Sequence, residues 1–243
     1  MVSRPTFPAD SITPAPVRPA WSFLTNHAVL LVYVALHPDS TVRTIAQDVG
    51  ITERASLAIM RDLDLEGIVD RRRTGRRNAY SVNFGRLAML RRGGTSSPLT
   101  PRLFVDVVVK TLFEIATQAG MVVHHEPPEI VRDGESQARV GSWGFFTNHM
   151  LILLAIARDG SQTVRDLSAA AMVTERAAVA ILNQMEAEGI IQRRREGRRN
   201  SYTIDYDGFF MFRGWQFEAW RLPPELIDVA ITGIRMLANR PGA

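Results

Sequence analysis

Ten arginines gather in two short stretches of the chain, where their side chains could bind a dense array of negative charge. The first group is Arg71, Arg72, Arg73, Arg76 and Arg77, and the second is Arg193, Arg194, Arg195, Arg198 and Arg199. A guanidinium stays charged at neutral pH and presents a planar fork of donors that fits pairs of phosphate oxygens. A solvated surface usually mixes charges of both signs, so this clustering indicates an anionic partner. The phosphates and minor groove of double-stranded DNA fit best.

The two arginine groups lie within segments that repeat each other. The sequence TERASLAIMRDLDLEGIVDRRRTGRRNAY starts at Thr52, and TERAAVAILNQMEAEGIIQRRREGRRNSY starts at Thr174, with no gap between matched positions. Each segment has the pattern of a helix, a glycine turn, an arginine-rich strand, a second glycine turn and a second strand. This pattern predicts a helix-turn-helix with a β-hairpin wing, present twice.

Helix-capping residues predict the elements that position these segments. Thr25 can cap a helix over Asn26 to Leu36, and Thr41 can cap a short second helix. Gly50 supplies a tight turn, after which Thr52 caps the third helix. Beyond each hairpin we expect one long packing helix, over residues 101–119 in the first copy and 224–239 in the second.

The whole chain therefore reads as a duplicated unit of about 120 residues. We predict a mainly α fold with small β-wings, in which two winged helix-turn-helix domains form a pseudo-twofold tandem and each is followed by a packing helix. The expected divisions are a flexible arm (1–20), domain 1 (21–97), packing helix 1 (98–121), a linker (122–142), domain 2 (143–221) and packing helix 2 (222–243).

The third helix of each unit is the candidate reader of the major groove, which admits one α-helix. We expect Glu53, Arg54, Ser56, Leu57, Met60 and Arg61 to point away from the core, as do Glu175, Arg176, Ala178, Val179, Leu182 and Asn183. The candidate DNA contacts in the first unit are Thr52, Glu53, Arg54, Ser56, Leu57, Arg61, Arg71, Arg72, Arg73, Arg76, Arg77 and Asn78. Those in the second unit are Thr174, Glu175, Arg176, Ala178, Val179, Asn183, Arg193, Arg194, Arg195, Arg198, Arg199 and Asn200.

Several of these residues have a second interpretation. Glu53 and Glu175 could accept from cytosine, or could stabilise the helix through its dipole. Leu57 and Val179 could meet thymine methyl groups, or could belong to helices that bind protein. The alternative function is therefore a tandem winged-helix scaffold for protein interaction, which the arginine-rich hairpins oppose.

The same motifs carry a resemblance to a known family. The opening WxFxTNH at residues 21–27, followed by TVR, TERA, EGI and GRRNxY, resembles winged helix-turn-helix transcriptional regulators of MarR-like type. Small single-domain regulators common in actinobacteria are the most similar, and the likeness covers residues 21–84 and 143–206. It implies sequence-specific binding of duplex DNA, usually by a dimer, to control transcription.

The chain departs from that family in two respects. It carries both copies itself, and Leu57 and Val179 replace the usual polar reader after TERA. We therefore expect a monomer that acts as a pseudo-dimer, or a homodimer, on an imperfect palindrome. The hairpins and reader helices of both units should lie on a shared side.

Other classes of function find little support in the sequence. The chain has no cysteine, no apolar run long enough to span a membrane and no secretory leader, which favours a cytoplasmic, nucleoid-associated protein. No catalytic constellation or phosphate-binding glycine loop occurs, and we expect no enzyme activity, cofactor or metal. His124 and His125 beside Glu126 are interpreted as solvent-exposed linker residues rather than metal ligands.

An aromatic tail follows the second hairpin and has no counterpart in the first unit. We expect it to pack against the trailing helices, or to form a pocket for a small-molecule or protein effector at the domain junction. Its residues are Phe209, Phe210, Phe212, Trp215, Phe217 and Trp220.

Overall fold

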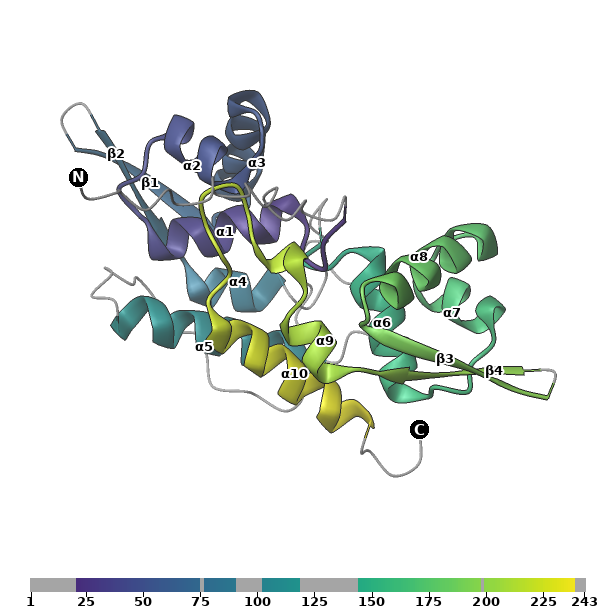
Figure 1. The fold of residues 1–243 in the computed structure, drawn as a ribbon. Coiled ribbons are helices and arrows are strands. Elements are labelled where there is room, and N and C mark those ends of the chain that lie inside the picture. Colours follow the sequence, from purple (N-terminus) through teal and green to yellow (C-terminus); the bar gives the residue numbers. More distant parts are fainter. Residues whose placement is uncertain (1–20, 75–76, 91–101, 119–143, 198, 239–243) are drawn as a thin grey trace, which may run out of the picture.

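The computed structural model describes residues 21–74, 77–90, 102–118, 144–197 and 199–238 (Figure 1). These residues form a mainly helical structure with two antiparallel sheets of two strands each. The predicted arm (1–20), the linker (122–142) and the boundary near residue 97 lie outside the described residues.

The elements occur in two series, which we call the first repeat (residues 21–118) and the second repeat (144–238). The first repeat contains α1 (Asn26–Leu36), α2 (Val42–Val49), α3 (Glu53–Leu65), β1 (Val69–Thr74), β2 (Arg77–Val82), α4 (Phe84–Leu90) and α5 (Arg102–Gln118). The second contains α6 (Asn148–Arg158), α7 (Val164–Ala170), α8 (Glu175–Ala187), β3 (Ile191–Glu196), β4 (Arg199–Ile204), α9 (Tyr206–Phe210), the 3₁₀ helix η1 (Arg213–Trp215) and α10 (Pro224–Ala238). Each element of the first repeat has a counterpart that begins 122 residues later.

Threonine caps define where these helices begin, as predicted. The hydroxyl oxygens of Thr25, Thr41 and Thr52 accept from backbone amides three residues further along the chain. Gly50 ends α2 in the left-handed conformation, with φ of 76°, which glycine adopts without steric cost. At the matching position of the second repeat Met172 has φ of 54°, a conformation that is uncommon for a side chain of this size.

Each hairpin is anchored at its base. In β1–β2, Arg71 pairs with Tyr80 and Arg73 with Asn78, and β3–β4 repeats the same register. The Tyr80 amide donates to Pro38 O at 2.9 Å, which ties β2 to the turn after α1. Tyr80 and Val82 are buried, so the inner half of the hairpin belongs to the core while the arginine-bearing half extends outward.

The two repeats meet at a reciprocal junction. Leu24 and Phe146, which occupy matched positions, form an antiparallel bridge between the segments that precede α1 and α6. The flanking hydrogen bonds are Thr25 N to Phe145 O (3.0 Å), Thr147 N to Phe23 O (3.0 Å), Thr25 Oγ1 to Gly144 O (2.6 Å) and Thr147 Oγ1 to Ser22 O (2.6 Å). Every bond has a mate in which the two repeats exchange roles, as across the twofold axis of a symmetric dimer.

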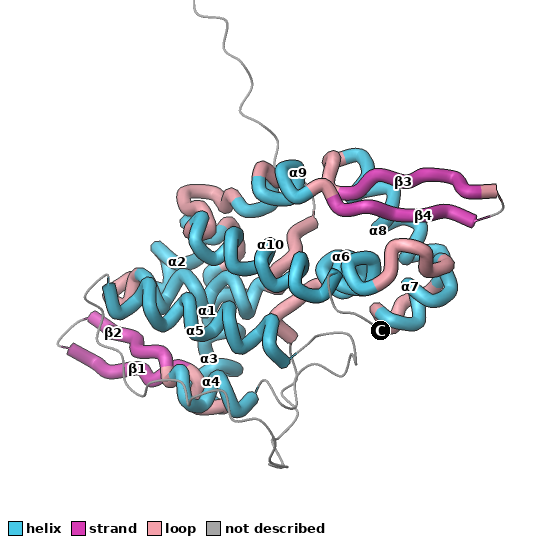
Figure 2. Tube along the Cα trace, turned by 90° about the horizontal axis from the view of Figure 1, so that it is seen from below, coloured by secondary structure: helices cyan, strands magenta, loops and turns pink. Residues whose placement is uncertain are grey.

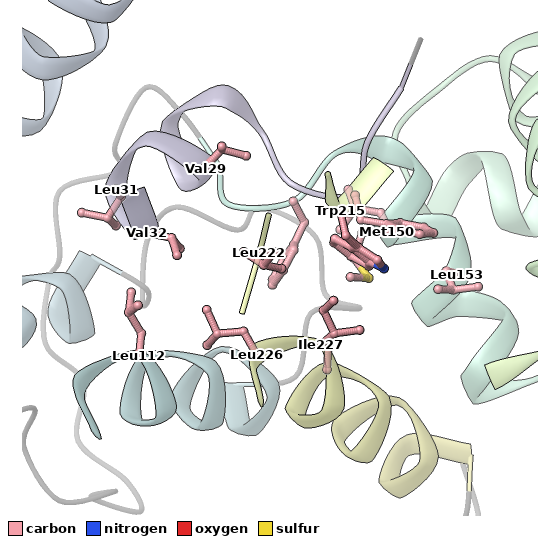
Figure 3. Packing of buried hydrophobic residues seen from close by; sticks show 14 of the residues in the cluster. Val29, Leu31, Val32, Leu112, Met150, Leu153, Trp215, Leu222, Leu226 and Ile227 are labelled. Atoms are coloured by element: carbon pink, nitrogen blue, oxygen red, sulfur yellow. The ribbon is translucent and has the colours of Figure 1, made fainter. Parts of the chain in front are cut away.

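A single hydrophobic core continues across this junction. Helices α5 and α10 lie side by side beneath the repeats, with α1 packed on α5 and α6 packed on α10 (Figures 1 and 2). Leu112 of α5 and Leu226 and Ile227 of α10 point into the same apolar interior, and all three side chains are at least 96% buried (Figure 3). The packing helices therefore join the repeats as the interface of a dimer would.

The aromatic tail also packs into the junction. Trp215 donates from Nε1 to Phe209 O at 2.8 Å, and Phe212 stacks on Trp21 with 4.4 Å between ring centroids. Phe209, Phe212 and Trp215 are at most 3% exposed, which confirms the packing interpretation. A narrow apolar cavity of about 30 Å³ lies beside Trp215 and is lined from α1, α5, α6 and α10, and an effector pocket at this junction stays a prediction.

The tail reaches from the second repeat onto the first. The Ala219 amide donates to Asp48 O of α2 at 3.1 Å, and Trp220 meets Tyr33 of α1 edge to face at 5.4 Å. This strap and the helices α4 and α9 were not predicted. The α4 helix begins at a cap made by Asn83, whose Oδ1 accepts from Arg86 N at 2.8 Å.

The junction can be weakened without removing a helix cap. The Thr147 hydroxyl donates to Ser22 O but makes no capping hydrogen bond in α6. We expect Thr147→Val to lower the free energy of unfolding by about 1 kcal/mol, because one intramolecular hydrogen bond is lost. Urea unfolding followed by circular dichroism would measure the change.

Thr117→Val is the matched control, because its exposed hydroxyl donates only to Phe113 O within its own helix. This variant should stay within about 0.5 kcal/mol of the wild type. If Thr147→Val were equally neutral, the reciprocal hydrogen bonds would not hold the repeats together.

Candidate nucleic-acid interface

Helices α3 and α8 lie on the side of the molecule that faces away from α5 and α10, whereas the hairpins extend from its opposite ends (Figures 1 and 2). The two helices thus share a side, as expected. The hairpins lie beyond them at either end and not next to one another.

The faces of α3 and α8 differ in part from the prediction. Glu53, Arg54 and Arg61 are exposed on α3, as are Glu175, Arg176 and Asn183 on α8. Leu57 and Val179, at matched positions, are 53% and 40% exposed, so both helices present an apolar side chain to solvent. Thr52 and Thr174 are exposed caps whose hydroxyls accept from amides of the first turn.

Four side chains predicted to point outward are buried instead. Ser56 and Ala178 are 0% exposed, Met60 is 7% exposed and Leu182 is 1% exposed. The prediction was wrong because positions 56, 59, 60 and 63 recur at helical spacing and form one stripe against the core. Ser56 and Ala178 are therefore removed from the candidate DNA contacts.

Most hairpin arginines that the structure describes are exposed, and the asparagines at the far end of each hairpin are half-buried. Arg76 and Arg198 lie outside the described residues, as does the side chain of Arg77. The exposed arginines are Arg71, Arg72, Arg73, Arg194, Arg195 and Arg199, and the half-buried asparagines are Asn78 and Asn200.

Arg193 differs from the other hairpin arginines because it bonds within the protein. Its Nη2 donates to Asn183 Oδ1 at 2.8 Å and lies 3.3 Å from Glu186 Oε2, both on α8. The guanidinium also lies over the ring of Tyr202, 5.7 Å from its centroid. Arg193 and Asn183, both predicted to contact DNA, therefore bond to each other and connect the hairpin to α8. The sequence did not reveal this role, because the two residues lie apart in the chain.

The first repeat has an open cleft at the same place. It lies between α3 and the hairpin, has a volume of about 490 Å³, and is lined by Arg54, Arg61, Arg71, Asp64 and Tyr80 among others. Within the described part of the chain, the three arginines have no hydrogen bond or ion pair to another side chain. The cleft therefore gathers three positive charges and one carboxylate, that of Asp64, beside the candidate reader helix.

The histidines that follow the caps have structural contacts. His149 bonds through Nε2 to Gln184 Oε1 of α8 at 2.8 Å and stacks on Trp21 with 4.2 Å between ring centroids. Burial of the ring lowers the pKa of His149, and the hydrogen bond to Gln184 opposes part of that shift. His27 contacts Asp62 of α3 at 3.2 Å. Both histidines connect the first helix of a repeat to its candidate reader.

Neither a metal centre nor a membrane span is found in the described residues. Among them, no three potential ligand side chains gather into a group that could hold a metal ion. No helix in the described part combines the length and apolar character needed to cross a bilayer. His124, His125 and Glu126 lie outside the described residues.

Comparison of the chain with protein-family models, with curated proteins and with solved structures finds no match.

Single substitutions at the matched positions 56 and 178 test whether both residues belong to the buried stripe. Ser56 Oγ is buried and has no hydrogen-bond partner, whereas the second repeat has alanine at the matched position. Removing an unsatisfied buried hydroxyl and introducing a better helix former should make Ser56→Ala more stable by about 1 kcal/mol. Thermal and urea unfolding would measure this gain.

Ala178→Ser is the reciprocal control and should be less stable than the wild type. A Ser56→Ala variant with reduced stability would mean that the hydroxyl has a partner and that the stripe is assigned incorrectly.

The lowered pKa of His149 predicts acid sensitivity. Because its folded pKa lies below the unfolded value of about 6.5, the unfolded chain binds more protons between these two values. The contribution of His149 to stability is therefore complete above about pH 6.5 and is lost as the pH falls to the folded pKa.

His149→Phe should reduce this loss of stability, since phenylalanine retains a ring to stack on Trp21 but does not titrate. The measurement is the free energy of unfolding in urea at a series of pH values from neutral to mildly acidic. Identical pH profiles for the variant and the wild type would contradict the assignment.

Proposed function

We propose that this protein is a sequence-specific, double-stranded DNA-binding transcriptional regulator built from two winged helix-turn-helix units. In this proposal α3 and α8 enter successive major grooves, and the arginine-rich hairpins contact phosphates or the minor groove. The observation that carries it is that each repeat has a helix with exposed charged side chains followed by an arginine-rich hairpin. A reciprocal junction relates the two repeats to each other.

The symmetry of the junction supports this proposal. Duplex DNA has a local twofold axis, and dimeric regulators match it with two reader helices roughly 34 Å apart, one helical turn of DNA. A covalent tandem can do the same as one chain, since the linker raises the effective concentration of the second reader near the first. Hairpins at the two ends would then lie over the flanking DNA on either side.

The exposed residues of the helices suggest how a sequence would be read. Arg54 and Arg176 stand in the first turns, where guanine edges or phosphates are within reach of such helices. Leu57 and Val179 suit contact with thymine methyl groups. Because Arg61 in α3 corresponds to Asn183 in α8, the two half-sites should differ, and the operator should be an imperfect palindrome.

The second candidate function is a scaffold that binds other proteins through the same helices. The exposure of Leu57 and Val179 favours it, because directional hydrogen bonds to bases are absent at these positions. The exposed hairpin arginines favour DNA, because a protein partner would have to provide matching negative charge at both ends.

Binding to DNA at a series of salt concentrations tests the proposal. A labelled duplex with a selected sequence should bind in low salt, and affinity should fall with a log–log slope of about −0.9 for each phosphate contact. Arg54→Ala combined with Arg176→Ala should weaken binding by about 1–3 kcal/mol per lost contact. Fluorescence anisotropy would measure both effects.

Arg235→Gln is the control, because this exposed arginine lies on α10, away from the side that carries α3 and α8. Its affinity for the duplex should equal that of the wild type. Failure of the pure protein to bind any duplex at low ionic strength would overturn the proposal and favour the scaffold.

A further inference from the structure

We propose that the two repeats hold DNA unequally, because Glu186 and Asn183 withhold Arg193 from the phosphates while its counterpart Arg71 is free to bind them. The first repeat then binds the DNA phosphates more strongly than the second repeat does. This inference rests on the proposed function and specifies how the same interface is divided.

The contacts of Arg193 define the withheld state. One nitrogen, Nη2, is shared between the amide oxygen of Asn183 at 2.8 Å and the carboxylate of Glu186 at 3.3 Å. The side chain is only 26% exposed, and its Nε is buried without a hydrogen-bond partner. Nη2 is therefore already engaged, and a phosphate that approaches this guanidinium must also approach the negative charge of Glu186.

The matched residues of the first repeat cannot form the same arrangement. Asn183 corresponds to Arg61, which repels the guanidinium of Arg71 instead of accepting a hydrogen bond from it. Glu186 corresponds to Asp64, whose side chain is shorter by one methylene group, and no ion pair joins Asp64 to Arg71. Arg71 is therefore exposed at the edge of the cleft.

The cleft of the first repeat suits a phosphate group. Arg54, Arg61 and Arg71 line the same space of about 490 Å³, so three guanidinium groups approach it from α3 and from the hairpin. Such a concentration of positive charge lowers the free energy of a bound phosphate and makes binding depend steeply on salt. The hairpins have the same register and α3 and α8 have matching bounds, so the difference between the two sites lies in the side chains at matched positions.

Single alanine variants of the full chain compare the two arginines. Against a labelled random-sequence duplex, Arg71→Ala should weaken binding about tenfold at low salt and reduce the log–log salt slope by about 0.9. Arg193→Ala should change affinity by less than about twofold and leave the slope unchanged, because Arg193 makes no phosphate contact in the wild type. Circular dichroism would verify that both variants fold.

Release of Arg193 provides the converse test, which does not depend on removing an arginine. Glu186→Gln should tighten binding and steepen the slope by about 0.9, since it removes the negative charge that pairs with Arg193 and repels phosphate. Asp228→Asn removes the same charge from an exposed position on α10, away from the side that carries α3 and α8, and should leave the slope unchanged. Adding Arg193→Ala to Glu186→Gln should abolish the gain.

The outcomes separate this inference from the proposed function. Equal losses for Arg71→Ala and Arg193→Ala, or equal slopes for Glu186→Gln and Asp228→Asn, would overturn the unequal division while DNA binding itself stood. A wild-type protein that ignores the duplex at low salt would overturn both.

Discussion

The reciprocal hydrogen bonds of Thr25 and Thr147 are the constraint on which the arrangement of the molecule depends. Each threonine donates across the junction from its amide and from its hydroxyl, and each bond is repeated with the roles of the two repeats exchanged. A closed twofold relation follows, and α5 and α10 bury their apolar faces against each other beneath it. Because the repeats are covalently linked, this relation does not depend on protein concentration, unlike that of a homodimer.

Within this symmetric frame the two repeats have diverged in sequence, and some of the differences lie at or beside the candidate interface. The elements keep their spacing, yet Arg61, Ser56 and Gly50 correspond to Asn183, Ala178 and Met172. Asn183 accepts a hydrogen bond from the hairpin residue Arg193, which Arg61 at the matched position cannot do for Arg71. Duplication within one chain permits such specialisation, since each copy can change without changing the other, which is impossible in a dimer of identical subunits.

Much of the fold could be predicted from the sequence because its signals are local. Threonine caps mark the starts of α1, α2 and α3, and a glycine in the left-handed conformation marks the end of α2. The alignment of the two halves transferred these bounds to the second repeat. What could not be predicted depends on tertiary contacts. The burial of Ser56, the bond between Arg193 and Asn183, and the strap of the aromatic tail on α2 all join positions that the local pattern treats separately.

The central claim is that one chain, acting as a pseudo-dimer, grips two adjacent half-sites on one face of a duplex. Hydroxyl-radical footprinting on a selected sequence, with the stoichiometry determined by light scattering of the complex, tests it most directly. The account predicts one chain per duplex and two unlike protected segments whose centres lie one helical turn apart, about 10 base pairs. A single protected segment, or two chains on each site with identical footprints, would contradict it.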